Sequence, residues 1–348
     1  MSILKPATST DSDVLVPPEL LGPALARATA DKGWLDLEPR LITGGKSNLT
    51  FELSSAAGRL ILRRPPTGKL LPRAHDMARE ARIQRALRPT DVPVAAVVLE
   101  DAGDLLGVPF YVMERVEGHV IRETLPDSYA STTAGRYALA YSLIDVLASL
   151  HRIDPAEVGL MDYGRHSGYL ERQVTRWSDQ WQRSRTRPVP GIEALASRLL
   201  QNLPAVSNLS IVHGDYRLDN CVMDARDPAR LQAVLDWELS TLGDPLSDLG
   251  SLMLFWRQPG ERHTSLTPGV SDQDGFPTRD ELAGRYAVLT GLDLTDLAFY
   301  EALAHFKFAA IVQGVAARAA AGAMGGQTFG DLDAEVEALA DSGLRLLD

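Results

Sequence analysis

The residues best suited to chemistry lie in IVHGDYRLDNCVM, residues 211–223, and in AVLDWE, residues 233–238. The residues between Asn220 and Asp236 have the pattern of two short strands joined by a turn. Because a hairpin brings its two ends side by side, Asn220 and Asp236 are expected to lie close together. An amide oxygen and a carboxylate suit Mg²⁺, a hard cation that takes oxygen ligands and keeps part of its water. Asp215 would then point toward an incoming nucleophile.

A glycine-rich segment, LITGGKSNLTF over residues 41–51, suggests a phosphate-binding P-loop because it contains Gly-Lys-Ser. The P-loop pattern requires another glycine five positions before the Gly-Lys pair. Arg40 occupies that position, and the flanking residues indicate strand–turn–strand rather than strand–turn–helix. The P-loop interpretation therefore fails.

The composition excludes several classes of protein. The chain has 348 residues, a formal net charge of −11 at pH 7 and one cysteine, Cys221. Nucleic acids and acidic membranes are bound by basic surfaces, so neither is an expected partner. A single cysteine excludes an internal disulfide framework and a cysteine-based zinc site. No apolar run reaches the roughly 20 residues that span a bilayer, and the N-terminus lacks a signal-peptide pattern. A cytoplasmic protein is expected.

The periodicity of apolar residues divides the chain into three parts. Residues 1–16 are expected to form a flexible tail. Residues 17–117 predict a small lobe of antiparallel strands with one key helix over 74–87. Residues 118–348 predict a larger, mainly helical lobe, and the fold class is therefore α+β. The strands of the small lobe are expected at 40–43, 49–53, 58–64, 94–100 and 108–116. The helices of the large lobe are expected at 135–153, 168–181, 191–203, 300–322 and 331–347.

The spacing His213-x-Asp215-x-x-x-x-Asn220 is that of the kinase catalytic loop. Together with other segments in order, it resembles the aminoglycoside phosphotransferase family, whose fold is the bilobal fold of protein kinases. The chain is most similar to the kinase-like domains related to those fused to some acyl-CoA dehydrogenases. The segments that carry the resemblance are GGKSNLTF, LRRPPTGKLLPRAHDMARE, VPFYVMERVEG, HGDYRLDN, LDWELSTLGDPLSDLG and FKFAAIVQGVAAR.

The resemblance implies that residues 17–117 form a nucleotide-binding lobe. Arg63 would occupy the place of the lysine that contacts the ATP phosphates in protein kinases, with Glu80 as its ion-pair partner. The turn that covers the phosphates with backbone amides would comprise Gly44, Gly45, Ser47 and Asn48. The hinge that binds the adenine edge would comprise Met113, Glu114 and Val116.

The resemblance also implies roles for the catalytic loop. Asp215 would orient and deprotonate the acceptor hydroxyl, and Arg217 would steady the γ-phosphate. Asn220 and Asp236 would hold Mg²⁺, with Glu238 as a further ligand.

The implied activity is ATP- and Mg²⁺-dependent transfer of the γ-phosphoryl group to a hydroxyl of a small molecule. Only 11 residues separate Asp236 from Asp248, too few for the activation segment of a protein kinase. His213 and Asp248 are expected to support the loop rather than react. The subfamily resemblance favours a hydroxyacyl or hydroxyacyl-CoA acceptor. The alternatives are an aminoglycoside, another amino-sugar or amino-alcohol acceptor, and a non-catalytic nucleotide-binding scaffold.

Overall fold

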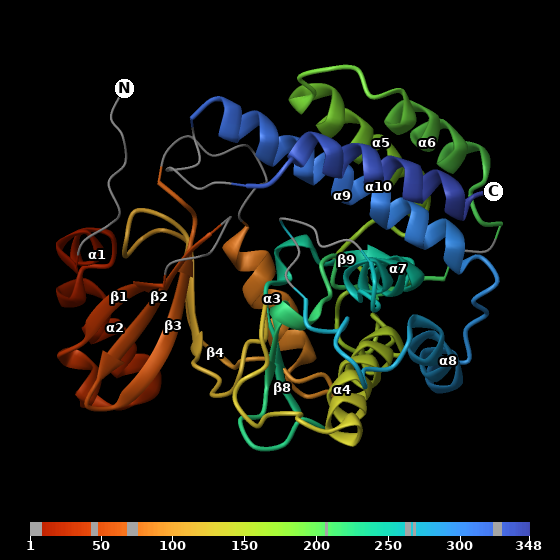
Figure 1. Cartoon of the computed structure of the whole chain (residues 1–348). Coiled ribbons are helices and arrows are strands. Elements are labelled where there is room, and N and C mark those ends of the chain that lie inside the picture. Colours follow the sequence, from red (N-terminus) through yellow and green to blue (C-terminus); the bar gives the residue numbers. More distant parts are fainter. Residues whose placement is uncertain are drawn as a thin grey trace. The chain divides into compact units, whose positions relative to one another are not determined.

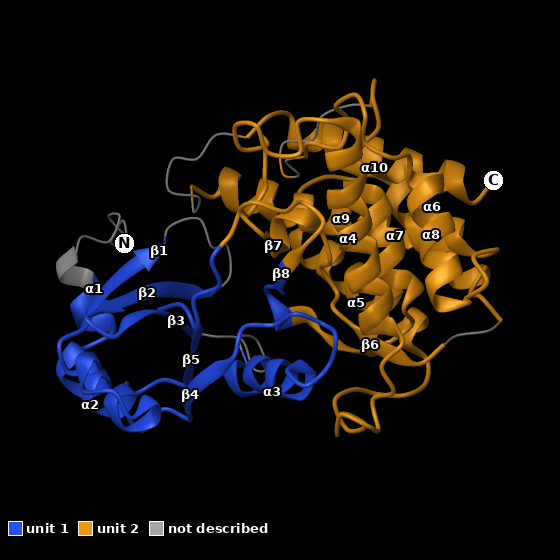
Figure 2. Cartoon of the chain, turned by 90° about the horizontal axis from the view of Figure 1, so that it is seen from below, with its two compact units in different colours: residues 1–117, 232–238 blue, residues 118–231, 239–348 orange. Residues whose placement is uncertain are grey.

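The computed structural model describes residues 9–42, 48–67, 76–205, 208–261, 266, 269–322 and 329–348. The chain forms two compact units, coloured separately in Figure 2. The first unit comprises residues 1–117 and 232–238, and the second comprises residues 118–231 and 239–348. The first unit therefore includes a short segment from the middle of the large predicted lobe.

The first unit is built on a five-stranded antiparallel sheet with the order β1-β2-β3-β5-β4 (Figure 1). Its strands are β1 (Glu38–Ile42), β2 (Leu49–Ser55), β3 (Gly58–Arg64), β4 (Val97–Asp101) and β5 (Phe110–Glu114). Each overlaps a strand expected from the sequence. Together with one packed helix, the sheet confirms the predicted fold of the small lobe.

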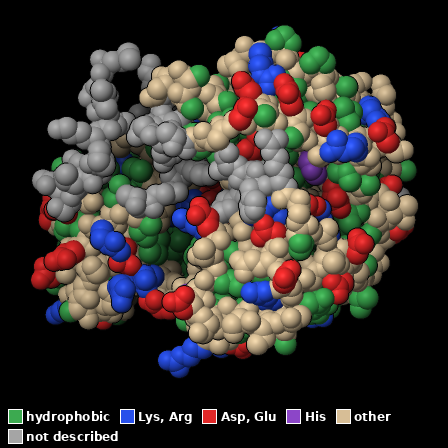
Figure 3. Space-filling view, in the orientation of Figure 1, with side chains coloured by type: hydrophobic (Ala, Val, Ile, Leu, Met, Phe, Trp, Pro, Cys, Tyr) green, Lys and Arg blue, Asp and Glu red, His purple; other side chains and the backbone are tan. Residues whose placement is uncertain are grey.

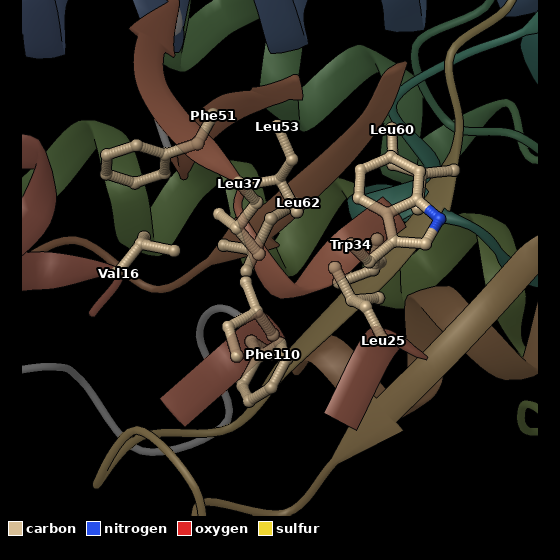
Figure 4. Close-up of a cluster of buried hydrophobic side chains, with 11 residues drawn as sticks. Val16, Leu25, Trp34, Leu37, Phe51, Leu53, Leu60, Leu62 and Phe110 are labelled. Atoms are coloured by element: carbon tan, nitrogen blue, oxygen red, sulfur yellow. The ribbon is translucent and has the colours of Figure 1, made fainter. Parts of the chain in front are cut away.

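One face of this sheet buries a cluster of apolar side chains, shown in Figure 4. The sheet, the helices α2 (Pro18–Thr29) and η1 (Lys32–Leu35), and the adjoining residues Val16 and Leu37 supply the cluster, and Leu15 of α1 (Ser9–Leu15) packs against it. Its members are Val16, Leu21, Leu25, Trp34, Leu37, Phe51, Leu53, Leu60, Leu62, Phe110 and Val112. Part of the stretch expected to be a flexible tail thus forms α1, and Val16 directly after it is fully buried.

The other side chains of β5 pack on the helix α3 (Met77–Leu87). Phe110 and Val112 belong to the first cluster, whereas Tyr111 and Met113 contact Met77 and Ala81 of α3. This alternation follows from the two-residue period of a strand. Asp76 caps α3 by accepting a hydrogen bond from the Arg79 amide at 3.0 Å. The helix thereby presents Glu80 toward the sheet.

The second unit is mainly helical, as predicted. Its longest helix, α9, packs against α5, α7 and α10 (Figure 1). Its helices are α4 (Thr133–His151), α5 (Tyr169–Ser184), α6 (Pro190–Gln201), α7 (Leu246–Phe255), α8 (Arg279–Thr290), α9 (Leu297–Ala320) and α10 (Leu332–Leu346). Short elements lie between them: β6 (Ser210–Val212), η2 (Leu218–Asn220), β7 (Cys221–Met223) and β9 (Thr241–Gly243). β8 (Leu231–Val234) and η3 (Trp237–Leu239) span the boundaries between the units.

Two helices of this unit, α7 and α8, were not expected from the sequence. Most residues of α7 are buried, so its sequence shows no polar face to mark the helical period. α8 carries a capping box, in which Thr278 and Glu281 bond each other's backbone amides, and it ends at Gly291. This terminal pattern was the sequence signal for α8. None of the helices in the described ranges combines the length and apolar character needed to cross a membrane.

Charged side chains of the described residues are mixed on the face shown in Figure 3. Acidic and basic groups are interspersed there rather than gathered by sign.

Candidate active site

In the first unit, the guanidinium of Arg63 lies between two carboxylates. Arg63 Nε is 3.4 Å from Glu80 Oε2 on α3, and Arg63 Nη2 donates to Asp236 Oδ1 at 2.9 Å. The ion pair predicted between Arg63 and Glu80 is therefore present. Burial alone would lower the pKa of Arg63, but Tyr111, Asp236 and Glu80 together raise it above its ordinary value. The permanently charged guanidinium of Arg63 is thus held near the C-terminal end of β3.

Glu80 is the most enclosed member of this cluster, with 1% of its surface exposed. Its Oε2 accepts a hydrogen bond from the Tyr111 hydroxyl at 3.0 Å, and its Oε1 accepts one from Asn48 Nδ2 at 3.0 Å. The same Asn48 amide donates to Glu238 Oε2 at 3.3 Å. Burial raises the pKa of Glu80; Arg63 opposes this effect, as do the two donors. Asn48 therefore joins two carboxylates through its side chain. The other predicted turn residues lie outside the described residues: Gly44, Gly45 and Ser47.

Asp236 adopts an unusual backbone conformation directly before η3. Its φ is 64°, in the left-handed region that few residues other than glycine occupy. Such residues persist where the surrounding structure holds them, and they are frequent at functional sites. The side chain is 36% exposed, so solvent reaches the carboxylate despite its contact with Arg63.

The oxygen donors of Asp236 and Glu238 have the chemistry that Mg²⁺ prefers. Within the described part of the chain, no group of three or more His, Cys, Asp and Glu side chains forms a ready-made metal site. The partly exposed carboxylate of Asp236 fits an ion that keeps several waters. The predicted pairing of Asp236 with Asn220 joins residues of different units and stays a prediction.

The predicted hinge lies at the end of β5. The Glu114 amide donates to the Ala96 carbonyl at 2.9 Å, and the Ala96 amide donates to Glu114 Oε2 at 3.2 Å. Met113 is buried and Val116 is partly buried, both against the α3 cluster. The hinge segment is thus fixed on one side by hydrogen bonds and on the other by apolar contacts.

In the second unit, β6 leads into a loop that is held at its backbone. Asp248 on α7 accepts hydrogen bonds from the His213 amide at 2.6 Å and the Gly214 amide at 2.8 Å. Lys307 on α9 donates to the Gly214 carbonyl. Gly214 has a φ of 85°, and a Cβ there would lie 2.7 Å from the Leu239 carbonyl oxygen. Only glycine fits this position, and both its backbone N–H and its carbonyl oxygen are hydrogen-bonded to side chains.

Asp215 lies next in this loop, together with two other predicted residues. Its Oδ2 accepts a hydrogen bond from Asn220 Nδ2 at 3.0 Å and is 3.5 Å from Arg217 Nε. Arg217 also pairs with Asp219 at 3.1 Å. The Asp215 amide donates to His213 Nδ1 at 3.2 Å. The side chain of Asp215 is 29% exposed, so a carboxylate of fixed orientation remains open to a ligand.

Three side chains that support this loop were not predicted from the sequence. Lys307 contacts Gly214 directly, whereas His151 and Tyr286 act further away, behind Asp248. Lys307 stands within the segment FKFAAIVQGVAAR as a cation between two phenylalanines, and this contrast was an available signal. For His151 and Tyr286 the sequence held no comparable signal, since their partners lie 97 and 135 residues away along the chain.

An antiparallel five-stranded sheet with one packed helix, followed by a helical unit that presents an His-Gly-Asp loop, defines a phosphotransferase with a kinase-like fold. A family model supports this class directly. The chain belongs to the phosphotransferase enzyme family, whose model matches residues 38–285.

Curated relatives confirm the resemblance to kinase-like regions of acyl-CoA dehydrogenase family proteins. The chain is 38% identical over 309 residues to acyl-CoA dehydrogenase family member 11 of Rattus norvegicus, covering 87% of the chain and 39% of that protein. It is 36% identical over 284 residues to family member 10 of Mus musculus, covering 80% of the chain and 26% of that protein. The chain thus spans well under half the length of these relatives.

Solved structures confirm the fold. A Ralstonia eutropha protein provisionally named an aminoglycoside phosphotransferase is 32% identical, with a TM-score of 0.81, covering 94% of this chain and 97% of that one. A thermostable mutant of an aminoglycoside phosphotransferase, solved with ADP and hygromycin B, is 15% identical with a TM-score of 0.58, covering 94% of this chain and 98% of that one. The second likeness extends to the fold alone.

Proposed function

We propose that the chain transfers the γ-phosphoryl group of ATP, with Mg²⁺, to a hydroxyl of a small molecule. The observation that supports this most is the loop around Asp215, where Asn220 and Arg217 contact one carboxylate that stays partly exposed. In this proposal Asp215 orients the acceptor hydroxyl and takes its proton. Asn220 fixes the direction of that carboxylate, and Arg217 stabilises charge on the transferred group.

The nucleotide would be bound by the first unit. Arg63 offers a planar, permanently charged donor group that suits phosphate oxygens. The backbone amides of residues 44–48 would cover the phosphates, and the hinge at 113–116 would bind the adenine edge. Asp236 and Glu238 would hold Mg²⁺ together with Asn220. When bound, this ion neutralises charge on the phosphates.

The favoured acceptor is a hydroxyacyl compound or its CoA thioester. Relatives with 36–38% identity are named as acyl-CoA dehydrogenase family members, and a kinase region attached to such an enzyme suggests an acyl substrate. An amino-sugar is the second candidate, because the Ralstonia protein at 32% identity carries an aminoglycoside phosphotransferase name.

The acceptor is tested by coupled ADP release with Mg·ATP against hydroxy acids, their CoA thioesters, aminoglycosides and amino alcohols. Turnover with a hydroxyacyl compound would support the proposal, and turnover confined to an aminoglycoside would replace it with the second candidate. Nucleotide binding without turnover on any acceptor would indicate a scaffold.

The Mg²⁺ assignment is tested by Asp236→Ala. Loss of this carboxylate is expected to abolish the Mg²⁺ dependence of nucleotide binding, measured by titration calorimetry with ATP at several Mg²⁺ concentrations. The exposed Asp341→Ala serves as a control that removes one acidic charge elsewhere. An unchanged Mg²⁺ dependence in Asp236→Ala would contradict the assignment.

A further inference from the structure

A line of buried polar side chains runs behind the loop of the second unit. It begins at Tyr286 on α8, whose side chain is fully buried. The Tyr286 hydroxyl lies 2.6 Å from Nδ1 of His151, the last residue of α4. The other ring nitrogen of His151, Nε2, lies 3.2 Å from Asp248 Oδ2 on α7. Three helices thus contribute one polar group each to a continuous chain.

Asp248 receives three hydrogen bonds at the end of this chain. Besides His151, the backbone amides of His213 and Gly214 donate to it. Burial would raise the pKa of Asp248, but His151 and His213 lower it below its ordinary value, so the group is a carboxylate. A carboxylate only accepts hydrogen bonds. His151 Nε2 must therefore carry a proton, and in the neutral ring Nδ1 accepts from the Tyr286 hydroxyl.

We propose that Tyr286 and His151 are positioning residues, which set the place of Asp215 through Asp248 and the backbone of His213 and Gly214. This inference rests on the proposed function only in taking Asp215 as the residue that orients the acceptor. Among the described residues, the hydrogen bonds of Tyr286 and His151 lead to Asp248 and not to Asp215, so both act at a distance.

The loop needs such support because of its backbone geometry. Gly214 is held in the left-handed region, where a glycine has many alternative conformations of similar energy. Asp248 accepts hydrogen bonds from the successive backbone amides of His213 and Gly214, and it thereby selects one of these conformations. Without the Tyr286 hydroxyl, the His151 ring loses the bond that fixes its rotation. A shift of the loop by about 1 Å is enough to reduce turnover substantially.

The molecule offers a closely matched control for this chain. Tyr300 on α9 is also buried, and its hydroxyl donates to Asp244 Oδ2 at 2.9 Å. Asp244 in turn accepts from the backbone amides of Asn208 at 3.2 Å and Leu246 at 3.1 Å. Tyr300→Phe and Tyr286→Phe therefore each remove one buried hydroxyl behind an aspartate that binds two amides. Only Tyr286 leads to the loop that carries Asp215.

The first measurement is amide hydrogen exchange by NMR and mass spectrometry, which needs no acceptor and no turnover. In Tyr286→Phe, exchange of the His213 and Gly214 amides is expected to accelerate roughly tenfold, the equivalent of one ordinary hydrogen bond. In Tyr300→Phe these two amides should keep wild-type rates, while Asn208 and Leu246 accelerate. Equal effects of both variants at His213 and Gly214, or no effect of Tyr286→Phe there, would overturn the proposal.

The second measurement is ADP release with Mg·ATP and water as the acceptor. Tyr286→Phe is expected to lower kcat by roughly tenfold while leaving KM for ATP unchanged, because misplacement of Asp215 affects transfer and not nucleotide binding. A rise in KM with unchanged kcat would contradict positioning. If the wild-type protein releases no ADP with water or with any hydroxyl acceptor, the proposed function fails, but the exchange measurement still decides whether Tyr286 holds the loop.

Discussion

The two units hold their candidate active-site residues by opposite means. In the first, Arg63 is bound through charged side chains, and one of its partners, Asp236, is 36% exposed. In the second, the contacts of Asp248 are buried, and two of them are to backbone amides. An ion pair with an exposed member can exchange that member for another anion at little cost. Buried backbone hydrogen bonds cannot be exchanged without loss.

This difference matches what each unit is proposed to do. A site for a polyanionic nucleotide needs cations whose resident partners can be replaced. A loop that aims one carboxylate at an acceptor needs a fixed backbone. Lys307, which donates to the Gly214 carbonyl, holds the backbone of this loop as well.

The largest expected effect is that of Asp215→Asn in the fixed loop. If Asp215 takes the acceptor proton, its loss should reduce turnover by about 10² to 10⁴-fold while nucleotide affinity stays near wild type. A coupled ADP-release assay measures turnover, and calorimetric titration with ATP measures nucleotide affinity. Turnover near the wild-type rate would remove Asp215 from the role assigned to it.

Arg63→Met tests how much the ion pairs of Arg63 in the first unit contribute to stability. The change leaves Glu80 buried without its cation, and it should lower the free energy of unfolding by about 3–5 kcal/mol. Urea unfolding measures this quantity. The control is Arg85→Met, which breaks an ion pair with Glu100 whose arginine is 47% exposed; about 0–1 kcal/mol is expected there. Equal losses in the two variants would show that the Arg63 cluster is no more than a surface pair.

Asn48→Asp asks whether the bridging amide must be neutral. The new carboxylate would stand between Glu80 and Glu238, which now accept from Asn48 at 3.0 and 3.3 Å. Loss of both donors and repulsion between carboxylates should destabilise the protein by roughly 2 kcal/mol. Asn202→Asp makes the same chemical change on an exposed side chain, where it removes one hydrogen bond to the Arg198 carbonyl, and it should lower the melting temperature less than Asn48→Asp. A stable Asn48→Asp protein would mean that the bridge contributes nothing.

The smallest effect is expected in the pH dependence of Glu80→Gln. Because the folded-state pKa of Glu80 is raised above 4.5, the folded protein binds its proton more readily than the unfolded chain. The contribution of Glu80 to stability therefore grows as pH falls from neutral toward 4.5 and declines as pH rises. Glu80→Gln should lose this slope. Parallel pH profiles of unfolding free energy for the two proteins would rule out the raised pKa.

The sequence predicted those parts of the site that are contiguous or that follow a period. The loop from His213 to Asn220 is contiguous, so its spacing identified it as a kinase-like catalytic loop, although the contact between Asp215 and Asn220 was not predicted. The strands around Arg63 followed from alternation, whereas the pairing of Arg63 with Glu80 followed from the family resemblance. Tyr286 and His151 were missed because their contact depends on how α8 packs on α4, which no local pattern encodes. α7 was missed because burial on all sides removes the polar face that reveals a helix.

The segment 232–238 belongs to the first unit although second-unit residues flank it on both sides. The polypeptide therefore passes between the units three times, after residues 117, 231 and 238. A single backbone break after residue 117 would leave residues 232–238 of the first unit covalently attached to the second. A fragment ending at Glu117 would also lack Asp236 and leave Arg63 without one of its anions. One cut between the units thus leaves the first unit incomplete, so the first unit cannot be excised intact as a continuous stretch of the chain.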